Sequence, residues 1–328
     1  MSSSSPAPSR GIFRATVLEN RPLCREHSLL RIHFPFFPPT RPGNFLQVLC
    51  RNPDLDLSDH ELAWPEGSFP TPTLPDTLTR TPLLRRPFSI ASRHDQPDSS
   101  TILELIQRVV GPGTSYLDSL RPSDPLDILG PLGNAFPTPD PDQSVLLIGG
   151  GVGIPPMIYL AQSLSRPKVI AFCGAQTKDL LSLTITSDAP PPKSPTSVDP
   201  LYNLGEFSRY GVPAVISTDD GTYGYKGYIT QALETYLGTY FPDTWSLGSR
   251  RPILFTCGPE IMMKRVAEIA LQRGLPCHAA VDRPMACGMG TCQSCIIKLK
   301  TPDNSPSPFR YALACTEGPI FNTTSLLW

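Results

Sequence analysis

The 328-residue sequence predicts a multi-domain protein of the β plus α/β class, with an antiparallel β-barrel, a doubly wound parallel sheet and a small C-terminal cysteine module. From Gly11 to about Asp127 the apolar runs are short, β-leaning and separated by turns, which is typical of an antiparallel barrel. After Gln143 buried strands alternate with helical segments, which indicates a parallel sheet with helices on both faces. From about Val281 onward cysteines gather.

The elements can be placed in order along the chain. Barrel strands are expected at residues 12–18, 28–34, 44–49, 88–91 and 101–110, with a short helical stretch at 115–120. In the α/β region we expect strands at 145–148, 169–173, 214–217 and 253–257, and helices at 154–164, 228–237 and 261–273. The chain then divides into a disordered tail (1–10), the barrel (11–141), the α/β domain (142–280) and the cysteine module (281–328).

Composition excludes several classes of protein. The 28 basic and 29 acidic residues give a net charge of −1, which leaves no electrostatic footprint for nucleic acid. No apolar run approaches the roughly 20 residues that cross a bilayer. The nine cysteines are odd in number, and no N-terminal apolar stretch precedes them, so disulfides are not expected. We expect a soluble cytoplasmic protein.

The 40 prolines cluster at residues 53–82, 137–141, 190–200 and 302–308. Proline ends helices and removes a backbone donor from strands, so these stretches belong outside the regular elements. We interpret them as surface insertions.

Four cysteines carry the most chemical information: Cys287, Cys292, Cys295 and Cys315. The pattern Cys-x4-Cys-x2-Cys with one distant cysteine is the plant-type spacing of a [2Fe-2S] cluster. Gly288 and Gly290 let the backbone curl and turn its amides toward the sulfurs. A structural zinc site is the alternative, although zinc usually pairs two short Cys or Cys/His knuckles. The spacing therefore favours one-electron transfer.

Two loops follow buried strands of the α/β region. The first contains Gly149, Gly150, Gly151 and Gly153. Glycines permit close backbone approach, and the helix N-terminus that follows offers unpaired amides and a favourable dipole for a dinucleotide pyrophosphate. The spacing is not the standard G-x-G-x-x-G, so a tight turn is the alternative. The second loop, Cys257-Gly258-Pro259, follows another strand of the same sheet, and ligands collect at the carboxyl ends of such strands.

Two tetrapeptides in the barrel region suit a flavin. Arg86-Pro87-Phe88-Ser89 pairs a guanidinium that can bind phosphate with a hydroxyl that can bind a heterocycle. Gly111-Pro112-Gly113-Thr114 opens a short helix, which also suits phosphate, although each tetrapeptide alone is more often a plain turn. Nicotinamides exchange hydride and iron–sulfur clusters exchange single electrons, so a flavin is expected between them.

The order of these motifs resembles the ferredoxin reductase superfamily, and most closely the electron-transfer subunits of two-subunit, NAD-dependent dihydroorotate dehydrogenase. The resemblance covers about residues 11–321. Its most specific pieces are LLRRPFSI (83–90), RVVGPGTSYL (108–117), LGPLGNAF (129–136), LLIGGGVGIPP (146–156), STDDGTYGYKG (217–227), MACGMGTCQSC (285–295) and YALACTEGPIF (311–321).

The resemblance implies a role for each motif. FAD would be held by Arg86, Pro87, Phe88, Ser89, Ile106, Gln107, Arg108, Gly113 and Thr114. NAD would be held by Gly149, Gly150, Gly151, Gly153, Cys257, Gly258 and Pro259, and the cluster by Cys287, Cys292, Cys295 and Cys315. We assign no catalytic residue. In the family, an FMN-containing subunit oxidises dihydroorotate in pyrimidine biosynthesis, and its electrons pass through [2Fe-2S] and FAD to NAD⁺. A heterotetramer with two copies of each subunit is implied.

Some residues depart from the family pattern. Gln176 stands in a segment where the family often has arginine, and the loss of that charge favours NAD over NADP. The stretches at 54–80 and 301–308 are additional, and either could alter partner docking. Two other functions stay open: an NAD(P)H-linked flavin and iron–sulfur reductase subunit of a hydrogenase or other ferredoxin-linked complex, and a zinc-stabilised binding protein without a redox role.

Overall fold

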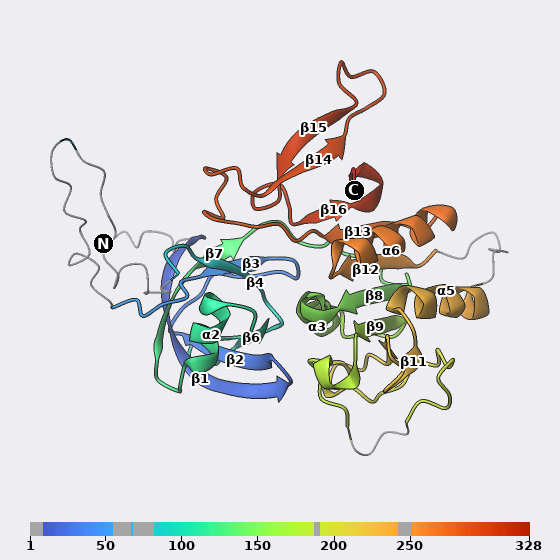
Figure 1. Cartoon of the computed structure of the whole chain (residues 1–328), viewed down its shortest axis with the longest axis horizontal. Helices are drawn as coiled ribbons and strands as arrows, with labels where there is room; N and C mark the ends of the chain where they lie inside the picture. The colour runs from blue at the N-terminus through green and yellow to red at the C-terminus, as the bar shows by residue number, and fades with distance from the viewer. Residues whose placement is uncertain (1–8, 55–66, 68–81, 187–190, 242–250) are drawn as a thin grey trace.

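A computed structural model (Figure 1) describes residues 9–54, 67, 82–186, 191–241 and 251–328. The expected tail lies outside the described residues except for Ser9 and Arg10, which are exposed, and most of the Pro-rich stretch 53–82 lies outside them too. Of the helices in the part of the chain that the structure describes, none is both long and apolar enough to cross a membrane.

The N-terminal half forms a seven-stranded antiparallel sheet. Its strands are β1 (Gly11–Cys24), β2 (His27–Phe34), β3 (Phe45–Val48), β4 (Arg86–Ser89), β5 (Ser92–Asp95), β6 (Thr101–Arg108) and β7 (Pro125–Leu132), in the order β4-β3-β7-β1-β2-β6-β5. The edge strands β4 and β5 are separated in the chain by only Ile90 and Ala91. Two opposite edges joined by two residues force the sheet to curl on itself, which is the expected barrel geometry.

Apolar side chains of alternate residues fill the inside of this sheet. Leu30, Ile32 and Phe34 of β2 pack with Leu46 and Val48 of β3 in one buried cluster. The helix α2 (Pro112–Ser119) follows β6 and begins three residues earlier than expected. The five expected strands are confirmed. The sequence missed β5, which is polar, and β7, whose prolines and glycine are unusual in a strand.

The second sheet is parallel over six strands. They are β8 (Val145–Gly150), β9 (Val169–Ala175), β10 (Ala214–Thr218), β11 (Tyr225–Lys226), β12 (Ile253–Cys257) and β13 (Cys277–Ala280), and β16 (Ile320–Asn322) adds an antiparallel edge in the order β11-β10-β9-β8-β12-β13-β16. The expected strands and helices of this region are confirmed, which establishes the predicted β plus α/β class.

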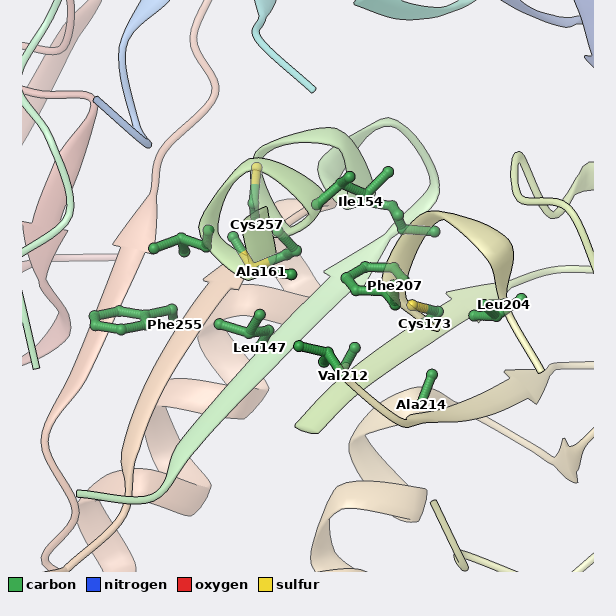
Figure 2. Close-up of a cluster of buried hydrophobic side chains, with 14 of the residues drawn as sticks. Leu147, Ile154, Ala161, Cys173, Leu204, Phe207, Val212, Ala214, Phe255 and Cys257 are labelled. Atoms are coloured by element: carbon green, nitrogen blue, oxygen red, sulfur yellow. The ribbon is translucent and has the colours of Figure 1, made fainter. Parts of the chain in front are cut away.

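Helices cover both faces of this sheet. On one face lie α3 (Ile154–Leu164) and α4 (Gly205–Ser208), and Figure 2 shows Ile154, Phe207 and Leu147 of this buried cluster. On the other face lie α5 (Ile229–Tyr240) and α6 (Glu260–Gln272), packed against Leu146 and Ile148. Successive β8 residues thus face opposite cores, which explains the uninterrupted apolar run. Short 3₁₀ turns lie at Gly151–Gly153, Lys178–Leu180 and Thr323–Ser325.

The C-terminal segment forms a separate hairpin and the last strand of the second sheet. Its hairpin, β14 (Ile296–Lys300) and β15 (Phe309–Leu313), stands apart at the top of Figure 1, and the Pro-rich stretch 302–308 forms its turn. Its last strand, β16, instead completes the second sheet.

Asn134 ties the chain between the two sheets to this C-terminal segment. Its amide nitrogen donates to the carbonyl oxygens of Glu317 (3.0 Å) and Ile320 (2.9 Å), and its amide oxygen accepts from the Ile320 N–H (2.9 Å). Nearby, Gly133 has φ +73°, and a Cβ there would lie 2.6 Å from Pro319 Cδ. The close approach therefore requires glycine, and the side-chain bonds of Asn134 set the register.

We expect Asn134→Ala to loosen the C-terminal segment. The change removes three hydrogen bonds, two of them to the backbone of the buried residue Ile320, so it should lower the free energy of unfolding by about 2–3 kcal/mol. Thermal unfolding followed by circular dichroism measures this. Asn134→Asp keeps the acceptor but not the donors, so its melting temperature should lie between those of the wild type and of the alanine variant. An unchanged melting temperature for the alanine variant would contradict the role of Asn134.

Candidate functional site

One cleft of about 1370 Å³ runs between the two sheets. From the first sheet it is lined by Arg86, Pro87, Phe88, Ser89, Ile106, Gln107, Arg108, Gly113 and Thr114. From the second it is lined by Gly150, Gly151, Gly153, Cys257, Gly258 and Pro259. The structure thus brings the residues expected for FAD and for NAD to a single cavity, although they lie up to 173 positions apart in the chain, as the interval from Arg86 to Pro259 shows.

Gly149 is the exception, because it does not line the cleft. A Cβ on this residue would lie 2.9 Å from Ile154 Cα and 3.2 Å from Met157 Cγ. Its glycine character serves the packing of β8 against α3, and its contact with a cofactor stays a prediction.

The first sheet places a cation beside a helix N-terminus. Thr114 Oγ1 accepts from the N–H groups of Val110 (2.9 Å) and Gly111 (3.1 Å), which fixes the turn that opens α2. A Cβ on Gly113 would lie 3.6 Å from Arg86 Cγ, so the Arg86 stem runs past the first turn of this helix. Among the residues that the structure describes, the guanidinium donates to the backbone oxygens of Leu84 (3.0 Å) and Arg85 (3.3 Å). An arginine beside a helix N-terminus suits a pyrophosphate.

Buried polar atoms in the cleft lack partners among the described residues. Gln107 Nε2 donates to Ser28 Oγ (3.1 Å), but Gln107 Oε1 accepts nothing. The Nε2 atom of His27, on the neighbouring strand, is also buried and unpaired, and burial lowers the pKa of this histidine. These atoms can bind a polar ring system such as a flavin. His27 carries no motif that would single it out, because its place beside the cleft depends on the register of β2 with β6.

The second sheet brings two loops into backbone contact. A Cβ on Gly153 would lie 2.2 Å from the Cys257 carbonyl oxygen, and Gly258 has φ +149°. Both loops follow adjacent strands at the carboxyl end of the sheet, since β8 pairs with β12. This is the expected place for a dinucleotide.

The expectation that the N-terminus of α3 offers unpaired amides to a pyrophosphate is wrong. The first turn of α3 contains Pro155 and Pro156, which have no N–H, and the Ile154 N–H donates to the Gly151 oxygen. The helix therefore offers few free amides, because proline occupies the positions that would carry them. The glycine loop ahead of the helix has to supply the donors.

Backbone N–H groups of two cysteines donate to the sulfurs of the other two. The Cys292 N–H donates to Cys287 Sγ, and the Cys315 N–H donates to Cys295 Sγ, both at 3.4 Å. The Met289 N–H also reaches Cys287 Sγ at 3.4 Å. Such amides stabilise thiolate sulfur, which is the form of cysteine that holds a [2Fe-2S] centre. In the described part of the chain, no three His, Cys, Asp or Glu side chains meet as a site for a single ion.

The environment of these thiols differs. Cys292 is exposed, and the Ser294 hydroxyl 3.2 Å away lowers the pKa of its thiol to about 6. Cys295 and Cys315 are buried, and desolvation raises the pKa of Cys315 to about 12 in the absence of a metal. Gly288 and Gly290 have φ +72° and +92°, which explains why glycine occupies both positions of the curl.

The cysteine segment packs directly behind the cleft. Val281, Asp282 and Met285, which precede Cys287 in the chain, line the cavity. Cys295 and Cys315 share a buried cluster with Phe45 of β3, and Phe45 also lines the cleft. The two sites are therefore in contact through packed side chains.

Comparison with known proteins agrees with this geometry. The iron–sulfur cluster binding domain of dihydroorotate dehydrogenase B matches residues 282–327. The chain is similar to the electron transfer subunit of dihydroorotate dehydrogenase B (NAD(+)) of Desulforamulus reducens, with 31% identity over 76% of this chain and 82% of that one. The subunit of Clostridium acetobutylicum is 30% identical over 75% of this chain and 80% of that one.

Solved structures share the fold. The NADH-dependent reduced ferredoxin-NADP oxidoreductase gives a TM-score of 0.66 at 23% identity, over 96% of this chain and 90% of that one. The ferredoxin reductase of carbazole 1,9a-dioxygenase gives 0.56 at 17% identity, over 84% and 70%. The resemblance seen in the sequence motifs is thus confirmed over most of the chain. The chain belongs to the family of electron transfer subunits of dihydroorotate dehydrogenase B.

Proposed function

We propose that this chain takes electrons from an FMN-containing subunit that oxidises dihydroorotate, and carries them through a [2Fe-2S] cluster and FAD to NAD⁺. The observation that carries the proposal is the single cleft, lined by both nucleotide-binding halves and backed by the cysteine segment. FAD, when bound, supplies the chemistry that links one-electron exchange with hydride exchange.

The residues of the chain would divide the work as follows. Arg86 and the first turn of α2 would bind the FAD pyrophosphate, and Ser89, Gln107 and His27 would orient the ring. The glycine loop at 150–153 and the Cys257-Gly258-Pro259 loop would admit the nicotinamide nucleotide, because neither places side chains larger than a thiol or a proline ring against it, apart from Val152. Cys287, Cys292, Cys295 and Cys315 would hold the cluster.

Electrons would enter at the exposed edge of the cysteine loop. Cys292 is exposed, and Met289, beside it in the loop, is 52% exposed. An apolar residue at such an edge suits a protein partner. We propose that the partner docks here, that the complex contains two copies of each subunit, and that it works in the cytoplasm.

The test is to purify the chain anaerobically, with the proteins bound to it, from the cells that make it. The complex should reduce NAD⁺ when dihydroorotate is added. A complex that retains FAD and iron but shows no dihydroorotate-dependent reduction would contradict the proposed substrate, and would move the chain to the NAD(P)H-linked reductase subunits.

A further inference from the structure

The Gln47 side chain in β3 is buried without a hydrogen-bond partner. Its exposed fraction is 0%, and neither Oε1 nor Nε2 meets a partner among the described residues. Its neighbours in the strand, Leu46 and Val48, point into the barrel core. A buried amide without a hydrogen-bond partner is destabilising, so its presence at this position requires an explanation that packing does not give.

The side chain faces the cysteine loop. A Cβ on Gly288 would lie 2.7 Å from Gln47 Cγ and 3.1 Å from Gln47 Nε2. Gly288 directly follows Cys287, the first of the four predicted ligand cysteines, and its φ of +72° is a conformation that favours glycine. The Gln47 amide therefore lies beneath the part of the loop that carries Cys287.

The same residue also adjoins the cleft. Gln47 pairs with Pro87 across the antiparallel strands β3 and β4, and Pro87 lines the cavity. Gln47 itself does not line the cavity. The amide thus lies between the cleft and the cysteine loop, where electrons would pass between the two cofactors.

We propose that Gln47 is a positioning residue that donates a hydrogen bond from its amide to sulfur of the loaded cluster, at the Cys287 thiolate or an adjacent sulfide. This inference rests on the cofactors of the proposed function. Hydrogen bonds to sulfur set the reduction potential of such clusters. Reduction adds one electron and breaks no bond, so the sulfurs become more negative and the donor stabilises the reduced form more than the oxidised form.

The test is the midpoint potential of the cluster, measured on the purified chain alone by redox titration with electron paramagnetic resonance. Gln47→Met keeps the length of the side chain and removes the donor. The midpoint potential of the cluster should fall by about 59 mV. For one electron this corresponds to a change of about tenfold in the equilibrium constant for exchange with a fixed mediator. Gln47→Glu keeps the shape but introduces a carboxylate, and should lower the potential further.

Ser182→Ala is the matched control. Ser182 is also 0% exposed, and its hydroxyl is also unpaired among the described residues, but it packs in the α/β half. The midpoint potential of the cluster in Ser182→Ala should equal that in the wild type. A wild-type potential in both Gln47 variants would overturn the inference and leave the proposed function intact, because the cluster would still be present. A chain without any cluster signal would overturn both.

Discussion

Cys292→Ser is expected to abolish electron transfer through the chain while FAD remains bound. Cys292 lies on the exposed side of the cysteine loop and none of its atoms lines the cleft, so its loss should spare the flavin site. Its low thiol pKa, about 6, shows that the loop already favours the thiolate that iron requires. Replacing a residue that hydrogen-bonds to a metal ligand typically lowers metal affinity or activity by about 10–100-fold. Loss of the ligand itself should therefore lower the rate of electron transfer by at least about 100-fold.

The measurement is the rate of dihydroorotate-dependent NAD⁺ reduction by the complex, together with the visible spectrum of the variant. The flavin bands should persist and the iron–sulfur bands should disappear. Cys277→Ala is the control, since Cys277 is a buried thiol outside the motif, in the core under α5 and α6, and it should keep wild-type activity. Loss of flavin with an intact iron spectrum would contradict the assigned layout.

Gly153→Ala should have the second large effect. The new Cβ would lie 2.2 Å from the Cys257 carbonyl oxygen and 2.4 Å from the Gly258 nitrogen. These are backbone atoms, so the two loops must separate, which is expected to cost about 1–3 kcal/mol of stability. A displacement of about 1 Å at a reacting centre can reduce turnover by about 100-fold. We expect that loss in kcat/KM for NADH, with normal FAD content.

Gly211→Asn is the control outside the cleft. Gly211 has φ +71° and no atom within 4 Å of the position of a Cβ, and it does not line the cavity. Asparagine tolerates this left-handed conformation better than other side chains, so the variant should keep NADH kinetics close to those of the wild type. Equal losses in both variants would show that the contact of Gly153 with Cys257 is not the cause of the loss.

The α/β half was the easier part of the fold to predict. Its helix at Ile154–Leu164 and its strand at Ile253–Cys257 follow the expected bounds, because buried strands and amphipathic helices leave distinct apolar patterns. The strand β7 was missed because its prolines argue against a strand. The strand β16 was missed because its sheet partner, β13, lies 40 residues earlier, as the interval from Ala280 to Ile320 shows, and no local pattern reports such a pairing.

The residues of the candidate site were predicted more completely for the cluster than for the nucleotides. The cysteine motif is compact in sequence, so its members were recognised together. The first turn of α3 was misjudged, since the sequence shows glycines and a helix start but not which amides stay free. Gln47 carries no sequence signal at all. Its position under Gly288 depends on how the C-terminal segment folds back onto β3.

The most direct test of the account is an anaerobic titration of the purified chain with NADH, followed by electron paramagnetic resonance. The central claim is that NAD, FAD and the cluster form one path within this chain. NADH should reduce the flavin and then produce the signal of a reduced [2Fe-2S] cluster in the wild type, and only reduce the flavin in Cys292→Ser. A wild-type cluster that stays oxidised after the flavin is fully reduced, although dithionite reduces it, would contradict the claim.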